Sequence, residues 1–75
     1  MKLCFCHKDG EKAGLYIIAD NKGRACRLFA NATRTRFSET IAETIRQVEI
    51  DESEKETILY PNSDIALSYG IEYAK

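Results

Sequence analysis

The most regular alternation of apolar and polar residues lies between Ile65 and Tyr73. Every second position there carries a bulky apolar side chain and the positions between are small or polar: Ile65, Leu67, Tyr69, Ile71 and Tyr73 against Ala66, Ser68, Gly70 and Glu72. Successive side chains of a strand point to opposite faces, so this period of two predicts a β-strand over 65–73. A helix is the alternative, but Gly70 in its middle would cost about 1 kcal/mol.

Three shorter apolar segments precede this one, at 3–7, 15–20 and 24–31. Asp9-Gly10 follows the first segment, and Asn21-Lys22-Gly23 separates the second from the third. Both are turn signals, because Gly adopts a positive φ at little steric cost. The sequence therefore predicts three strands joined as an antiparallel meander. Apolar side chains occupy both faces of these strands, so we expect a loop or another chain to cover the second face.

After Arg36 the apolar period changes to that of a helix. Between 37 and 48 the apolar residues recur along one helical stripe: Phe37, Ile41, Ala42, Ile45 and Val48. Ser38 and Thr40 are rival N-caps of the helix that this stripe predicts. Farther on, residues 57–60 are predicted to form a short strand that Pro61 ends, because proline cannot donate to a ladder.

Together these elements predict an α+β fold. The expected architecture is an antiparallel β-sheet in the order β-β-β-α-β-β, with one amphipathic helix packed on one face. The chain has 75 residues, which is enough for one small domain spanning 1–75. A core of this size supplies little net stability, so support from a partner subunit is expected.

The net charge of −1 conceals an uneven distribution along the chain. Residues 1–36 carry eight Lys or Arg against three Asp or Glu, a balance of +5, whereas residues 37–75 carry three against nine, a balance of −6. Such asymmetry bears on partners and association rate rather than on fold. The sequence shows neither a signal-peptide core nor a membrane span, so we expect a cytoplasmic protein with no membrane partner.

Three cysteines, Cys4, Cys6 and Cys26, are the first candidates for chemistry. Their odd number predicts reduced, buried thiols rather than a disulfide framework. In a strand His7 points away from Cys4 and Cys6, which argues against a zinc site and against a catalytic thiol–histidine pair. No phosphate-binding Gly loop or acid–base pair stands out either. We therefore expect no enzyme activity, no catalytic residue, no metal and no cofactor.

These exclusions favour a protein that binds another protein. The candidate contact residues are an acidic run and three tyrosines, a type enriched in interfaces: Glu49, Asp51, Glu52, Glu54, Glu56, Tyr60, Tyr69 and Tyr73. The acidic run would imitate a phosphate track on a basic partner, and the second apolar face favours a homodimer. An inhibitor, adaptor or regulator is expected. Compact inhibitors that phages make against host defence complexes are similar in size and in lack of motifs.

Nucleic-acid binding through a basic hairpin over 22–36 is the alternative function. Five cations cluster in this segment: Lys22, Arg24, Arg27, Arg34 and Arg36. Phosphate backbones attract such a cluster, and the binding would weaken steeply with salt. The balance of −6 in the second half of the chain opposes this function, because phosphates would be repelled there.

Overall fold

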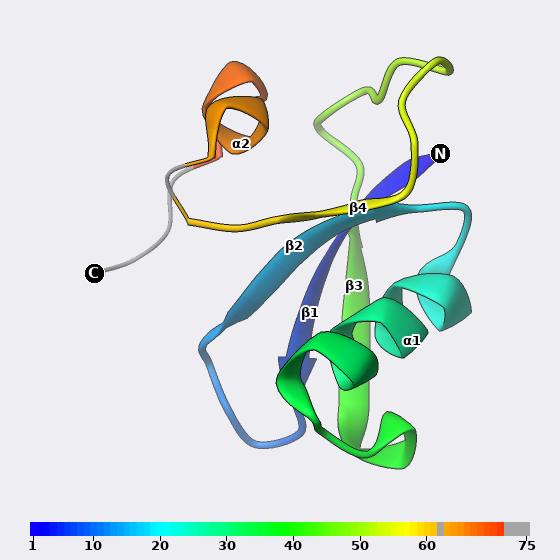
Figure 1. Cartoon of the computed structure of the whole chain (residues 1–75), viewed down its shortest axis with the longest axis vertical. Helices are drawn as coiled ribbons and strands as arrows, with labels where there is room; N and C mark the ends of the chain where they lie inside the picture. The colour runs from blue at the N-terminus through cyan, green and yellow to red at the C-terminus, as the bar shows by residue number, and fades with distance from the viewer. Residues whose placement is uncertain (62, 72–75) are drawn as a thin grey trace.

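The structure, a computed structural model, describes residues 1–61 and 63–71. The elements follow in the order β1 (Lys2–Lys8), β2 (Gly14–Ala19), α1 (Lys22–Thr33), the 3-10 turn η1 (Phe37–Glu39), β3 (Thr40–Ile45), β4 (Thr57–Leu59) and α2 (Asp64–Ser68). Every strand pair is antiparallel, and the strands lie side by side in the order β3-β1-β2-β4. Helices α1 and α2 lie on opposite sides of this sheet (Figure 1). The predicted α+β class, a helix on an antiparallel sheet, is confirmed.

The first hairpin agrees with the prediction for 3–7 and 15–20. Strands β1 and β2 pair from Lys2 opposite Ala19 to His7 opposite Gly14. Gly10 has a φ of 84° in the turn between them, a conformation that costs little without a Cβ. At Gly14 an added Cβ would lie 2.1 Å from the Cys6 carbonyl oxygen, so the close approach of the two strands requires glycine.

The strand predicted over 24–31 is wrong, because this segment forms α1. The Asn21 side-chain oxygen accepts the backbone N–H of Arg24 at 2.8 Å, so this residue caps a helix instead of turning a hairpin. The buried residues of α1 are Ala25, Cys26, Phe29 and Ala30, two pairs at the i, i+4 spacing of one helical face. Small residues at three of these positions let the helix lie close to the sheet.

The helix predicted over 37–48 is also wrong. A single 3-10 turn at its start leads into β3, which pairs with β1 from Ile45 opposite Leu3 to Thr40 opposite Lys8. Four of the six β3 residues are Thr or Ile, whose branched Cβ favours a strand over a helix. The apolar residues that form a helical stripe also fit this strand, because a short apolar run satisfies both periods. The predicted order of the elements is corrected to β-β-α-β-β-α.

The third correction concerns the strand predicted over 65–73. Residues Asp64–Ser68 form α2, whose N-terminus is capped by the Ser63 hydroxyl accepting the Ala66 N–H at 3.2 Å. Gly70 has a φ of 73° just after this helix, and the Ile71 N–H donates to the Ala66 carbonyl oxygen. The glycine thus ends the helix rather than weakening its middle. The short strand predicted over 57–60 is confirmed as β4.

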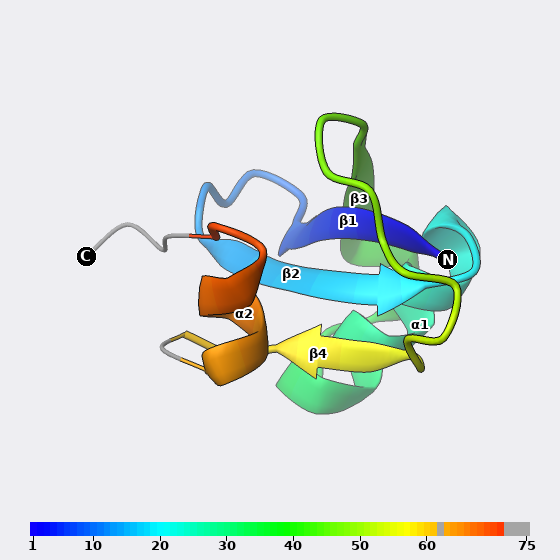
Figure 2. The same ribbon diagram turned by 90° about the horizontal axis from the view of Figure 1, so that it is seen from above.

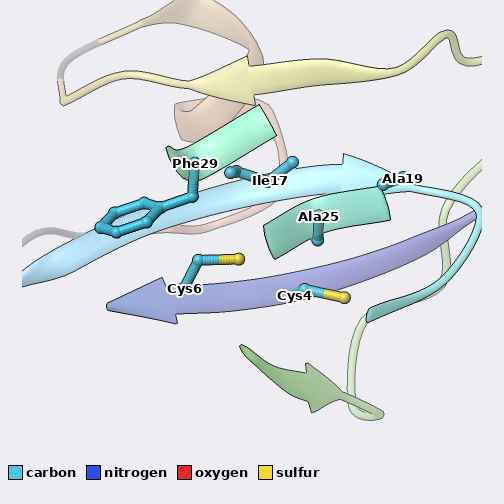
Figure 3. Packing of buried hydrophobic residues seen from close by; sticks show 6 residues of the cluster. All are labelled: Cys4, Cys6, Ile17, Ala19, Ala25 and Phe29. Carbon is cyan, nitrogen blue, oxygen red and sulfur yellow. The ribbon is translucent and has the colours of Figure 1, made fainter. Parts of the chain in front are cut away.

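Two groups of buried side chains hold the sheet and its covers together. Between α1 and the sheet lie Cys4, Cys6, Ile17, Ala19, Ala25 and Phe29 (Figure 3). On the opposite side, which we call the second face, the buried residues are Leu3, Ile18, Leu59, Ala66 and Ile71. The second face is covered by the short α2 and by the segment after β3, which crosses in front of β1 in Figure 2.

Candidate protein-binding surface

The second face is only partly covered. Alternation along β1 places Leu3, Phe5 and His7 on this face, and β2 adds Tyr16 and Ile18. Leu3 and Ile18 are buried, whereas Phe5, His7 and Tyr16 are half-buried. The cover therefore ends between Leu3 and Phe5 along β1, and three aromatic side chains remain in contact with solvent.

These three rings form a continuous row across the two central strands. The Phe5 and His7 ring centroids are 5.8 Å apart with an interplanar angle of 28°, and those of Phe5 and Tyr16 are 4.9 Å apart at 54°. His7 Nδ1 donates to the Lys8 carbonyl oxygen at 3.0 Å, which fixes the orientation of the imidazole. Both distances lie in the favourable range for aromatic pairs. The row is preorganised before any partner arrives.

Strand β3 extends this row toward the edge of the sheet. Ile41 lies opposite His7 and Glu43 lies opposite Phe5, both on the second face. Ile41 is 37% exposed although it is a large apolar residue in a strand. The five residues that form this partly uncovered area are Phe5, His7, Tyr16, Ile41 and Glu43, and we call them the open face.

A groove adjoins the open face at the start of β1. Its apolar lining residues are Met1, Leu3, Ile45, Val48 and Ile50, and its volume is about 690 Å³. The polar lining residues are Lys2, Thr44, Arg46, Glu49, Asp51 and Glu52. We call this the acidic groove after its three carboxylates, which lie on the segment that follows β3. Since Leu3 is two residues from Phe5 on the same face, the groove and the aromatic row follow each other along one strand.

The acidic residues predicted as contacts thus separate into two groups. Glu49, Asp51 and Glu52 line the acidic groove, but Glu54 and Glu56 do not. The single Nε–H of Arg24 is shared by the two carboxylate oxygens of Glu56, at 2.9 and 3.0 Å, and the two side chains form an ion pair. The Asp51 carboxylate accepts from the backbone N–H and the hydroxyl of Ser53, which lowers the pKa of Asp51.

The predicted tyrosines differ in exposure among the described residues. Tyr60 follows β4 and is 54% exposed. Tyr69 is half-buried and packs against the apolar residues of the second face. Tyr73 lies outside the described residues. Besides Tyr60, two side chains of α2, Ile65 and Leu67, are exposed apolar groups.

The five cations of the predicted basic hairpin lie on and after a helix. Lys22, Arg24 and Arg27 are exposed residues of α1, and the Arg27 guanidinium lies 4.6 Å from the centroid of the Phe37 ring. Arg34 ends α1 with a φ of 57°, in the left-handed region. Together with Lys8, Arg34 and Arg36 line a second groove, whose lining also includes Glu11 and Glu39. Acidic neighbours therefore offset part of the positive charge at both ends of α1.

The three thiols are free, buried between α1 and the sheet. Burial raises the pKa of Cys6 to about 12, and the neighbouring Cys26 and Cys4 add to the rise. The pKa values of Cys4 and Cys26 are also raised by burial. A thiol that stays protonated is neither a nucleophile nor a metal ligand at neutral pH. Across the described part of the chain, no three His, Cys, Asp or Glu side chains are grouped as a metal would require.

Prediction from the sequence missed the aromatic row. The alternation in 3–7 does place Phe5 and His7 on one side, but nothing in the sequence indicates where the cover of that side ends. One signal does point to Ile41. If 40–45 is read as a strand, Ile41 and Glu43 share one face, and a charged residue on that face indicates that the face contacts solvent. Tyr16 carries no such signal.

Comparison with protein-family models, curated proteins and solved structures found no match for this chain. In the described residues, no helix has the length and the apolar character that crossing a membrane requires.

Proposed function

We propose that this chain is a non-enzymatic domain that binds another protein, and that the partner lies on the open face. The observation that carries this proposal is the half-exposed aromatic row, which the exposed Ile41 extends, beside the buried Leu3 and Ile18 of the same face. Phe5, His7 and Tyr16 contact each other at short ring distances and still face solvent. Rigid aromatic anchors of this kind supply much of the binding energy in protein interfaces.

The acidic groove indicates the chemistry of the partner. An apolar segment laid along β1 would contact the rings of Phe5 and His7 and, at the Leu3 end, would meet the segment 48–52, which covers Leu3 and lines the acidic groove. Glu49, Asp51 and Glu52 are exposed on this segment, so a Lys or Arg of the partner is favoured at that end. The partner we propose is thus an apolar segment with a basic residue at one end.

A domain that binds a partner and catalyses no reaction would act as an inhibitor, adaptor or regulator. A phage inhibitor of a host defence complex is one protein of this type. Such a domain acts by occupying a surface that its partner needs. The cytoplasm is the compartment we propose, and the free thiols of Cys4, Cys6 and Cys26 support it, because reducing conditions preserve them.

The test compares two aromatic surfaces of the same chain. Partners are captured from the native host with the wild type and identified, and their affinity is then measured for Phe5→Thr/His7→Thr. Threonine keeps the strand propensity of both positions. We expect at least about a 30-fold loss, the effect of removing an interface hot spot. The control is Tyr60→Thr, an exposed aromatic residue outside the open face, which should bind as the wild type does.

Nucleic-acid binding remains a second candidate, favoured by one observation. Residues Lys22–Thr33 of α1 contain no Asp or Glu, and Arg27 and Arg34 lie on its exposed side or end. If α1 binds phosphates, Arg27→Glu/Arg34→Glu should abolish a gel shift at low salt, whereas Lys55→Glu in the acidic segment should not. No gel shift for the wild type, with single-stranded or duplex nucleic acid, would reject this candidate.

A further inference from the structure

The two edges of the sheet differ in what they offer to another strand. Strand β4 has three residues, whereas β3 has six, Thr40–Ile45, and contains neither proline nor lysine. Edge strands that avoid pairing usually carry such residues or are short. Figure 2 shows β3 at the border of the sheet, with the chain continuing from it toward the opposite edge. The outer side of β3 is therefore a ladder without a partner strand in the described part of the chain.

The hydrogen bonds of β3 to β1 determine which backbone groups point outward. The Asp9 N–H donates to the Glu39 carbonyl oxygen at 2.7 Å, and these residues continue the register that pairs His7 with Ile41. In an antiparallel ladder the hydrogen-bonded pairs alternate with non-bonded pairs. Residues 41, 43 and 45 therefore bond to β1, and 40, 42 and 44 direct their N–H and C=O groups outward. The Thr40 N–H is already bonded to Phe37, which leaves Ala42 and Thr44 as outward donors.

We propose that a second copy of this chain pairs with this edge, antiparallel, with Ala42 of β3 opposite Ala42 of the other copy. This edge shares Ile41 and Glu43 with the open face, but the proposal rests on the outward backbone groups of β3 and not on the proposed function. The second copy carries the same outward N–H and C=O groups on its own β3, so the donors of each edge face the acceptors of the other. Its two central hydrogen bonds join the Ala42 N–H and C=O groups of the two copies.

Side chains select this register over its neighbours. A shift that places Glu43 opposite Glu43 of the other copy would put two carboxylates on directly facing residues. A further shift the same way, with Thr44 at the centre, would need residues beyond Ile45, where β3 ends. The shift the other way, with Ile41 opposite Ile41, would pair Ala42 with Thr40, whose N–H is already bonded to Phe37, and would leave the Thr44 N–H without a partner in β3 of the other copy. With Ala42 at the centre, Ile41 lies beside the aliphatic part of Glu43 of the other copy. On the α1 side the meeting residues are small, Ala42 with Ala42 and Thr40 with Thr44.

This pairing would double the open face. A two-fold axis perpendicular to the sheet places both α1 helices on one side and both aromatic rows on the other. The product is a continuous antiparallel sheet in the order β4-β2-β1-β3-β3-β1-β2-β4. The interface consists of few hydrogen bonds and little apolar area, so the association is weak, with a Kd on the order of 100 µM.

Sedimentation equilibrium up to about 1 mM tests the proposal with one pair of variants. Ala42→Pro removes an N–H that points away from β1, so the fold keeps its ladder while the central bonds of the dimer are lost. Its dimer Kd should rise at least tenfold over that of the wild type. Ala42→Ser retains the N–H and should dimerise as the wild type does. A wild type that stays monomeric, or a folded Ala42→Pro variant that dimerises equally, would overturn the proposal.

Amide hydrogen exchange of the wild type gives a test that needs no substitution. The amides of Ala42 and Thr44 should gain protection as concentration rises through the Kd. Those of Ile41 and Glu43 are bonded to β1 and should be protected at every concentration. Protection of Ala42 and Thr44 that does not change with concentration would contradict pairing at this edge, even if the chain dimerises.

Discussion

The two faces of the sheet are covered in different ways, and the size of their side chains explains the difference. On the α1 side, Cys4, Cys6, Ala19 and Ala25 are small and fully buried, so a 12-residue helix lies close against the strands. The second face carries larger side chains and is covered in part by the five-residue α2. The α1 side is fully covered and therefore contributes only to the stability of the fold. The second face is partly covered and leaves the aromatic row in contact with solvent, which is the feature that supports a binding function.

The largest expected effect comes from making one substitution on each face. Phe29→Ala removes a ring that is 5% exposed between α1 and the sheet, and should lower the free energy of unfolding by about 3–5 kcal/mol. Phe5→Ala removes the same group from the half-buried row and should cost only about 1 kcal/mol, because less area is buried. Urea unfolding measures both. Equal losses would mean that the second face is as structural as the first.

A smaller effect is expected in the pH dependence of stability, because the buried thiols lie on the α1 side and not on the second face. Burial raises the pKa of Cys6 from 9.0 to about 12 in the folded chain. The protonated thiol is the neutral form, so its contribution to stability is complete below pH 9 and is lost as the pH rises toward 12. The slope for this thiol is about 1.4 kcal/mol per pH unit.

Urea unfolding of the wild type and of Cys6→Ser between pH 8 and 11 measures how the free energy of unfolding of each protein changes with pH. Cys6→Ser has no thiol at this position and should lose less stability per pH unit than the wild type, whatever its stability at neutral pH. Equal slopes for the two proteins would show that Cys6 is accessible to water, and the contrast between the faces would then be weaker than we describe.

The smallest effect concerns the residue that ends α1. Arg34 adopts a φ of 57°, which an L side chain occupies at a cost that glycine avoids. Arg34→Gly should therefore raise the free energy of unfolding by about 0.5–1 kcal/mol. Arg34→Ala keeps the Cβ and should gain nothing. Thermal unfolding of the pair separates backbone strain from loss of the guanidinium; a gain in both variants would instead point to charge repulsion.

The predicted class of the fold is right although two elements are exchanged: the strand predicted over 24–31 is α1, and the helix predicted over 37–48 contains β3. The prediction misassigned three elements for local reasons. Asn21 and Gly23 suggest a hairpin loop as readily as a helix cap; in the structure Asn21 caps α1, and Phe29 of this helix packs against the sheet. In the segment after Arg36, four β-branched residues favour a strand although their spacing also fits a helix.

The ends of the elements carried more information than the periodicity. Ser63 and Gly70 delimit α2 as cap and terminator, yet the unbroken alternation between 65 and 73 favours a strand when read alone. Similarly, the candidate site was only partly predictable. Glu49, Asp51 and Glu52 do line a groove, but the role of the rings depends on where the cover stops, which is a property of the tertiary structure.

The central claim is that the open half of the second face, not the α1 side, contacts the partner. The most direct measurement is the set of side-chain NMR shifts that change when a captured partner is added to the labelled chain. We predict the largest changes in the rings of Phe5, His7 and Tyr16 and the methyls of Ile41, with little change in Phe29 or in the α1 arginines. Changes confined to Arg27, Arg34 and Arg36, with the aromatic row unaffected, would contradict the account.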